Sequence, residues 1–258
     1  MRQPRHERII QLVKQNGYMS IDALARELDV TPQTIRRDIN MLAEEDILRR
    51  YHGGAGLGSN SVQNEDYVKR KNWNQQEKDR IAMLVADHIP DNSSLFMNIG
   101  TTVESVARSL LNHSGLKIIT NNLNVASIFA GREEFEVTIA GGTVRQRDGG
   151  IIGEATIDFI RQFKVDYAVM GISGIDEDGT LLDFDYREVR VAQAMIEHAR
   201  KIYLVADHSK IGRNAVVKLG HISQVSAMFT DIPLPESLQQ QVDAAGVNVY
   251  LANETAPA

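Results

Sequence analysis

The sequence predicts an α/β protein with two domains, a small N-terminal winged helix-turn-helix and a larger C-terminal α/β domain. Three short helical patterns come first, and a hairpin with a Gly-Gly turn follows them. From residue 76 onward, apolar strands alternate with amphipathic helices, which indicates a largely parallel sheet. The chain has 258 residues, and a domain commonly has roughly 100–200. We place the domains at residues 1–57 and 76–252, with a linker at 58–75.

The composition excludes several classes of function. The chain has no cysteine, so disulfides, thiolate metal sites and cysteine nucleophiles are excluded, and we predict neither a metal nor a cofactor. The N-terminus is charged and lacks the apolar core of a signal peptide. No apolar run approaches the roughly 20 residues that span a bilayer. We therefore expect a cytoplasmic protein without a membrane partner.

The charge is divided unequally between the two parts. The net charge is −6, but residues 1–57 contain nine Lys and Arg against eight Asp and Glu. The remaining 19 basic and 26 acidic residues make the second part acidic. Arginines of the first part are grouped at positions 36–37 and 49–50, and such local grouping favours contact with nucleic-acid phosphates.

The first two helices are predicted at residues 5–15 and 21–28. Asn16-Gly17 ends the first helix, and Tyr18-Met19 forms a short strand. Ser20 caps the second helix, because its hydroxyl can accept from an amide of the first turn. A three-residue turn then leads to the third helix, which is the helix-turn-helix arrangement.

The third helix has the features of a DNA-reading helix. Thr31 caps it, and Pro32 suits its first position. Ile35, Ile39 and Leu42 fall on one face. The opposite face carries Arg, Gln and Asn, the side chains that pair with purine edges in the major groove. For this helix in isolation, a solvated face is the alternative.

The hairpin after the third helix resembles the wing of a winged helix. Residues 47–55 read as a strand, a Gly-Gly turn and a return strand, with arginines and a histidine able to contact DNA. A surface histidine without a role is the alternative for His52. The predicted DNA-binding residues are Thr31, Gln33, Thr34, Arg36, Arg37, Asn40, Arg49, Arg50 and His52.

The elements of the second domain follow from the alternation. Strands are predicted at 94–99, 116–120, 136–140, 166–172, 201–206, 225–230 and 247–251, and helices at 77–88, 102–111, 123–130, 155–163, 187–199 and 235–245. Ligands of such domains bind at the C-terminal ends of the strands.

One strand end is suited to an anion. Asn98-Ile99-Gly100-Thr101-Thr102 opens a helix directly after an apolar strand, so free amides and two hydroxyls can face a phosphate. A capped helix without a ligand is the alternative. Lys210 at another strand end can neutralise the anion, or it is an ordinary solvated lysine.

Other strand ends offer groups for hydroxyls. Asn121 follows one strand, and Asp176 and Asp183 lie in a Gly-rich acidic segment. Asp-Gly pairs also form ordinary turns, which is the alternative for this segment. Together, these groups favour a small phosphorylated polyol or sugar as ligand.

These motifs resemble a known family. Thr31 to Asp38, followed by Arg50-Tyr51-His52-Gly53-Gly54-Ala55, closely resembles the deoxyribonucleoside-regulator (DeoR) family of bacterial repressors. The resemblance implies an operator-binding first domain and an effector-binding second domain. A single small reading domain makes few phosphate contacts, so we expect a homo-oligomer, a dimer or tetramer, on repeated half-sites.

The second domain is also similar to ribose-5-phosphate isomerase, and Glu188 lies where those enzymes carry a catalytic glutamate. The acidic segment begins with Gly171 in place of aspartate, and no lysine occurs between Gly174 and Arg187. The departures imply binding without turnover, so the protein is not expected to be an enzyme. An isomerase with a regulatory domain is the alternative.

Further segments are similar to family members that govern glycerol 3-phosphate use. They include Asp148 to Thr156 and Asp207 to Asn214. The resemblance implies repression of glycerol 3-phosphate catabolism genes and glycerol 3-phosphate as effector, with another phosphorylated sugar as the alternative. The predicted effector-binding residues are Gly100, Thr101, Thr102, Asn121, Asp176, Asp183, Glu188 and Lys210.

Overall fold

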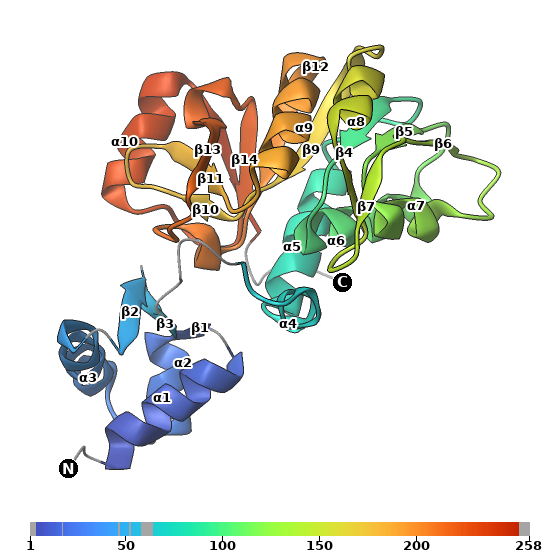
Figure 1. Cartoon of the computed structure of the whole chain (residues 1–258). Helices are drawn as coiled ribbons and strands as arrows, with labels where there is room; N and C mark the ends of the chain where they lie inside the picture. Colours follow the sequence, from blue (N-terminus) through green and yellow to red (C-terminus); the bar gives the residue numbers. More distant parts are fainter. Residues whose placement is uncertain (1–3, 17, 46, 52, 58–63, 253–258) are drawn as a thin grey trace.

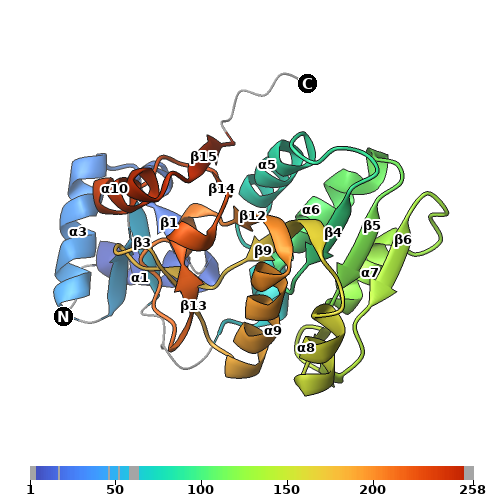
Figure 2. The same ribbon diagram turned by 90° about the horizontal axis from the view of Figure 1, so that it is seen from above.

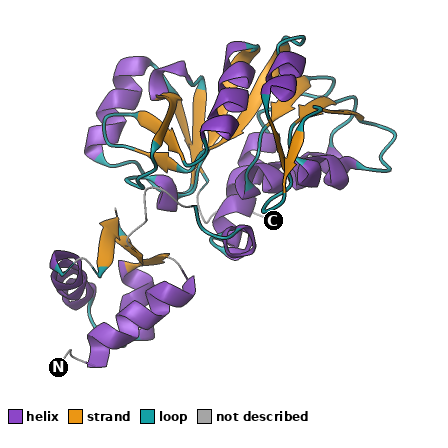
Figure 3. Cartoon of the chain, in the orientation of Figure 1, coloured by secondary structure: helices purple, strands orange, loops and turns teal. Residues whose placement is uncertain are grey.

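The computed structural model describes residues 4–16, 18–45, 47–51, 53–57 and 64–252. A small unit of helices and a three-stranded sheet comes first, and a larger α/β unit follows it (Figure 1). Figure 3 shows the alternation of helices and strands in the larger unit.

The first unit has the predicted order of elements: α1 (Pro4–Asn16), β1 (Tyr18–Ser20), α2 (Ile21–Glu27), α3 (Pro32–Glu44), β2 (Leu48–Tyr51) and β3 (Gly54–Leu57). The antiparallel hairpin β2–β3 is the wing, and β1 pairs with its second strand. The predicted winged helix-turn-helix is confirmed.

One apolar cluster holds the first unit together. Ile35, Ile39 and Leu42 of α3 are buried against Ile9 of α1 and Leu24 of α2. These are the apolar positions that the helical spacing predicted for α3. Burying one apolar stripe per helix leaves the polar face of α3 directed outward.

The larger unit begins with α4 (Tyr67–Asn72) and α5 (Gln75–Ala86). Its other helices are α6 (Thr101–Ser109), α7 (Leu123–Phe129), α8 (Glu154–Ile160), α9 (Tyr186–Glu197) and α10 (Glu236–Ala245), with 3-10 turns η1 (Leu110–Asn112), η2 (His208–Lys210) and η3 (Ile222–Gln224). The strands of its main sheet are β4 (Ser94–Met97), β5 (Lys117–Thr120), β6 (Glu136–Ile139), β9 (Val165–Gly171), β12 (Ala199–Val205), β14 (Ala227–Thr230) and β15 (Asn248–Leu251).

The main sheet has seven strands in the order β15-β14-β12-β9-β4-β5-β6. Every pair in it is parallel, as predicted. The order runs outward in both directions from β4 and β9 (Figure 2). Parallel sheets open a ligand crevice where the order reverses, at the C-terminal ends of the strands.

Helices cover both faces of the main sheet. Apolar residues of α5, α6 and α7 pack on one face, and residues of α8, α9 and α10 pack on the other. Because helices cover both faces, the central strands are apolar over most of their length, which explains why apolar runs predicted them. The edge strand β6 is only partly buried.

Several short elements were not predicted. Two small antiparallel sheets lie outside the main one, formed by β7 (Thr143–Arg145) with β8 (Gly150–Ile152), and by β10 (Gly174–Ile175), β11 (Thr180–Asp183) and β13 (Val217–His221). Strands this short show no clear periodicity. Helix α4 lies within residues 58–75, which the sequence analysis treated as a linker.

Within the described residues, none of the helices is both long and apolar enough to cross a membrane.

Candidate functional site

The start of α3 has the geometry that its sequence predicted. Thr31 has extended backbone angles, and its hydroxyl accepts from the amide of Thr34 at 3.3 Å. The exposed residues of this helix include Gln33, Arg36, Arg37 and Asn40. The cap therefore fixes where the helix begins, and the polar side chains share its solvent-facing side.

A buried carboxylate attaches α3 to α1. Asp38 is 4% exposed, and its oxygens accept from Arg5 Nε at 2.6 Å and contact His6 Nε2 at 3.1 Å. Burial alone would raise the pKa of Asp38, but the hydrogen bonds from Arg5 and His6 outweigh it and hold this pKa below its usual value. This pairing orients α3, and the sequence analysis did not find it.

The wing places two arginines beside α3. Arg49 and Arg50 are exposed, and Arg50 Nη1 lies 3.5 Å from Asn40 Oδ1. Arg36 and Arg50 also line a groove that they share with Glu177 of the larger unit. The predicted contact residue His52 lies outside the described residues.

A polar pocket lies where the sheet order reverses, at the C-terminal ends of β4 and β9. Its free volume is about 30 Å³, so the side chains that line it lie close together. Its lining residues come from strand ends, helix starts and the segment before α5: Asn64, Arg70, Ile99, Gly100, Thr101, Thr102, Arg145, Asp148, Gly171, Ile172, Ser173, Asp183, Glu188, Lys210 and Arg213.

One side of the pocket is the N-terminus of α6. No described side chain caps this helix, so its first amides remain available to an anion. Gly171 lets α6 pack closely against the end of β9, because a Cβ at this position would lie only 3.3 Å from Val103 Cγ2. Thr101 and Thr102 add hydroxyls to the same side.

Lys210 adds positive charge to the pocket. Its pKa is lowered to about 7, chiefly by burial, and Arg213, Lys78 and Arg70 lower it further while Asp207 opposes the shift. A bound anion would favour the charged form of Lys210 and raise this pKa. The side chain is therefore placed to respond to a phosphate.

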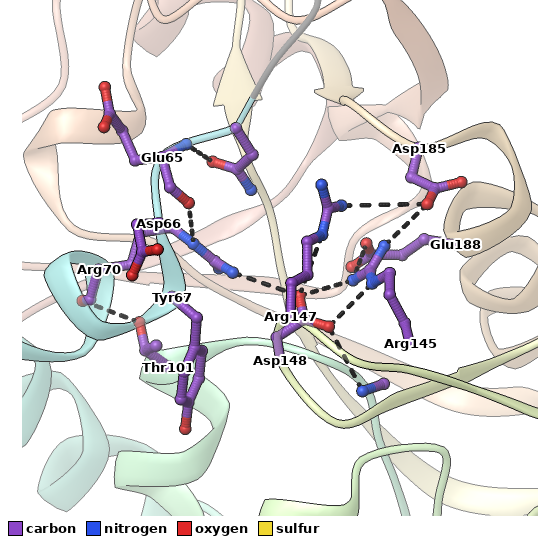
Figure 4. Close-up of polar contacts among 12 residues, drawn as sticks. Glu65, Asp66, Tyr67, Arg70, Thr101, Arg145, Arg147, Asp148, Asp185 and Glu188 are labelled. Carbon is purple, nitrogen blue, oxygen red and sulfur yellow. Dashed lines mark hydrogen bonds and ion pairs between the residues drawn. The ribbon is translucent and has the colours of Figure 1, made fainter.

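The opposite side is an ion-pair network around Arg145 (Figure 4). Its guanidinium contacts Glu188 at 2.7 Å, Asp148 at 2.8 Å and Asp185 at 3.0 Å. Burial raises the pKa of Glu188, and the nearby Asp183 raises it further despite the pairing with Arg145. A carboxyl group of this kind can donate as well as accept a hydrogen bond to a hydroxyl.

Asp183 also lines the pocket, and it is buried. Its Oδ1 accepts from Ser173 Oγ at 3.0 Å and from the Phe184 amide at 2.7 Å. Burial raises the pKa of Asp183, and these hydrogen bonds partly offset the shift. Its second oxygen leaves acceptor capacity for a hydroxyl of a ligand.

Residues 73–232 match the model of the DeoR C terminal sensor domain, and residues 5–61 match the DeoR-like helix-turn-helix domain. The chain belongs to the DeoR family. The resemblance noted in the sequence is thereby confirmed.

Curated relatives in the family cover most of this chain. It is 56% identical over 236 residues to the "Glycerol-3-phosphate regulon repressor" of Escherichia coli (strain K12), covering 92% of this chain and 93% of that protein. It is 54% identical over 249 residues to the protein of the same name from Haemophilus influenzae, covering 96% of each. Both relatives are named as repressors and not as enzymes.

A solved ribose 5-phosphate isomerase from Methanocaldococcus jannaschii is a distant structural neighbour. The TM-score is 0.40 with 14% identity, covering 54% of this chain and 55% of that chain. This likeness concerns the fold of the sensor domain and says nothing about activity.

The pocket brings together six of the predicted effector-binding residues: Gly100, Thr101, Thr102, Asp183, Glu188 and Lys210. Asn121 and Asp176 are not part of its lining. The Asn121 amide donates to the carbonyl of Ile151, holding the β7–β8 hairpin. The backbone of Asp176 pairs with Thr180 and Gly179 in a turn, which is the alternative that its Asp-Gly context suggested. We therefore leave both out of the proposed site.

Most of the charged residues that line the pocket were not predicted from the sequence. Arg70, Arg145, Asp148 and Arg213 had no motif that marked them as pocket residues. Arg70 and Asp148 are 78 positions apart in the chain, so only the fold brings them together. Arg145 and Asp148 lie on the β7–β8 hairpin, whose strands were not predicted. Among the described residues, no cluster of three His, Cys, Asp or Glu is arranged to hold a metal ion.

Proposed function

We propose that this protein is a transcriptional repressor of glycerol 3-phosphate catabolism genes and that glycerol 3-phosphate binding releases it from its operator. The observation that carries the proposal is the composition of the pocket. Free amides of α6 and Lys210 suit a phosphate, and Asp183 and Glu188 on the other side suit hydroxyls. The printed name of the relatives supports the choice of ligand.

The proposed DNA contacts are made by α3 and the wing. Gln33, Arg36, Arg37 and Asn40 would read base edges, and Thr31, Thr34, Arg49, Arg50 and His52 would contact phosphates or flank them. One small reading domain makes few contacts, so we also propose a homo-oligomer that binds repeated half-sites. A repressor must reach its operator, which implies a cytoplasmic location.

Turnover is not part of the proposal. Glu188 is held by Arg145 at 2.7 Å, and the relatives named above are repressors. The pocket would therefore bind its ligand and release it unchanged.

Calorimetric titration tests the ligand. Glycerol 3-phosphate should bind, and glycerol, which lacks the phosphate, should not bind measurably. Thr101→Ala with Lys210→Ala should abolish binding, whereas the exposed pair Thr143→Ala with Lys218→Ala should leave it unchanged. If another phosphorylated sugar bound more tightly, that sugar would be the effector. Normal binding of glycerol 3-phosphate to the Thr101/Lys210 variant would disprove the proposed site.

A further inference from the structure

The segment that joins the two domains also forms part of the effector pocket. Asn64 and Arg70 line the pocket together with Gly100 and Lys210. Both precede α5, in the stretch that the sequence analysis treated as a linker. We call residues 64–74 the strap. Figure 4 shows Arg70 reaching from α4 toward Asp148 and the ion-pair network of Arg145.

The backbone of the strap is bound by residues of the pocket. The hydroxyl of Thr101, at the start of α6, donates to the carbonyl of Arg70 at 3.3 Å. Lys78, whose side chain is almost wholly buried, donates to the same carbonyl. Arg70 is thereby attached to the helix end that faces the proposed phosphate position.

Both ends of the strap are also attached. Arg213 donates to the Asn64 side chain at 3.0 Å, and the Asn74 amide donates to Asp207 at 2.9 Å. Between them, the Tyr67 hydroxyl donates to Glu104 at 2.9 Å. Of these partners, Arg213 lines the pocket, and Asp207 and Glu104 belong to the segments that carry Lys210 and Thr101.

The guanidinium groups of Arg70 and Arg145 both contact the carboxylate of Asp148. Arg70 Nη2 lies 3.3 Å from Asp148 Oδ2, while the same carboxylate holds Arg145 through two hydrogen bonds of 2.8 Å. The side chain of Arg70 is only 11% exposed. The lining of the pocket holds four basic side chains, those of Arg70, Arg145, Lys210 and Arg213, against the three acidic ones of Asp148, Asp183 and Glu188. This excess of basic groups favours a phosphate there.

We propose that Arg70 binds the phosphate of the effector, so that the occupied pocket holds the strap closed. This inference rests on the proposed function and states how effector binding would control operator binding. A ligand shifts an equilibrium only through contacts that differ between two states. A contact with Arg70 exists only while the strap is bound to the pocket, so the effector stabilises the closed state.

Closure of the strap limits how far the DNA-binding domain can reach. With residues 64–74 bound, six residues (58–63) remain between the wing and the anchored chain, and they span at most about 20 Å. With the strap released, the 17 residues from 58 to 74 span at most about 60 Å. Half-sites lie about 34 Å apart, and closing the strap narrows the range over which each reading helix can move to meet its half-site.

Hydrogen exchange of the full chain, with and without glycerol 3-phosphate, tests the proposal. The ligand should slow amide exchange across residues 66–73 in the wild type. Arg70→Ala should weaken binding at least tenfold, since a charge-assisted contact is lost, and should abolish that slowing. The control Lys71→Ala, an exposed lysine on the same helix, should behave like the wild type. Unchanged exchange in the presence of bound ligand, or full affinity in Arg70→Ala, would overturn the proposal.

A second variant tests the strap without altering the lining of the pocket. Tyr67→Phe removes the hydrogen bond to Glu104 and should raise the effector concentration that half-releases the operator. An unchanged concentration would contradict the coupling. If glycerol 3-phosphate does not bind at all, the proposed function fails. The role of the strap is then tested with inorganic phosphate as the ligand. Slower amide exchange of the strap that is lost in Arg70→Ala and retained in Lys71→Ala would support the role. Unchanged exchange would overturn it.

Discussion

Arg145 Nη2 lies 2.7 Å from Glu188 Oε2, inside the pocket where the sheet order reverses. The same guanidinium holds Asp148 and Asp185. The pairing ties the β7–β8 hairpin to the start of α9. It also pairs Glu188, the residue in the position of the isomerases' catalytic glutamate, with a guanidinium group.

Arg145→Ala should destabilise the sensor domain by about 3–5 kcal/mol, because it leaves buried carboxylates without their partner. Urea unfolding followed by circular dichroism measures the change. The matched control is Arg147→Ala. Its side chain is 45% exposed and contacts the same Asp148 at 3.7 Å, so its loss should cost less than about 1 kcal/mol. Equal effects of the two substitutions would contradict the importance of the Arg145 network.

Arg36→Ala should weaken operator binding, because it removes an exposed side chain of α3 that can pair with a base or phosphate. A loss of about 1–3 kcal/mol is expected for a base contact. Fluorescence anisotropy with a labelled operator at fixed salt measures it. Arg132→Ala, an equal charge change on the exposed surface of the sensor domain, should have no effect. Affinity that drops equally in both variants would point to a general charge effect.

Asp38→Asn should lower the stability of the N-terminal domain by about 2 kcal/mol, since hydrogen bonds to the charged carboxylate are lost. The pKa of Asp38 is lowered in the folded state. Its contribution to stability is therefore present above its unfolded pKa of about 3.9 and disappears as the pH falls through the lower folded value. Thermal unfolding at neutral and acid pH should show a difference between wild type and variant only at neutral pH. The exposed Asp22→Asn serves as the control.

Effector affinity should fall as the pH rises above about 7. Lys210 has a pKa of about 7 in the free pocket, and only its charged form attracts the phosphate. At higher pH, binding must first protonate Lys210, and affinity then decreases up to tenfold per pH unit. Below about pH 6 the phosphate itself gains a proton, so the test belongs between pH 6.5 and about 9.

Lys210→Arg should flatten this pH dependence, because arginine stays charged throughout the range. Calorimetry across the range, in buffers of different ionisation enthalpy, measures both the affinity and the proton uptake. Lys218→Arg, at an exposed position, should retain the wild-type slope. If the affinity of Lys210→Arg still fell with rising pH, the proton taken up on binding would belong to another group.

Local signals predicted much of the architecture. Thr31 and Pro32 mark the start of α3 because capping depends on adjacent residues, and the structure confirms that start. The central strands of the main sheet were found because burial on both faces makes most of their residues apolar. Gly100-Thr101-Thr102 was recognisable because a strand end and a helix start meet there within five residues.

The rest of the pocket depends on contacts between distant segments. Arg70 had no local feature to separate it from the other charged residues before α5, and its role follows from a carboxylate 78 positions away. Asp38 looked like an ordinary polar position of α3 until Arg5 and His6 were placed beside it. Asn121 and Asp176 were predicted as ligand contacts from their residue types and positions. In the structure, Asn121 binds the carbonyl of Ile151 and Asp176 lies in a turn.

Titration of the operator complex with glycerol 3-phosphate tests whether the effector releases the repressor from its DNA. The full-length protein is bound to labelled operator DNA, and anisotropy is followed as the ligand is added, with glycerol and inorganic phosphate in parallel. We expect glycerol 3-phosphate to release the operator from the wild type, and the Thr101/Lys210 double variant to stay bound throughout. Operator affinity that is unchanged at saturating glycerol 3-phosphate would contradict the claim.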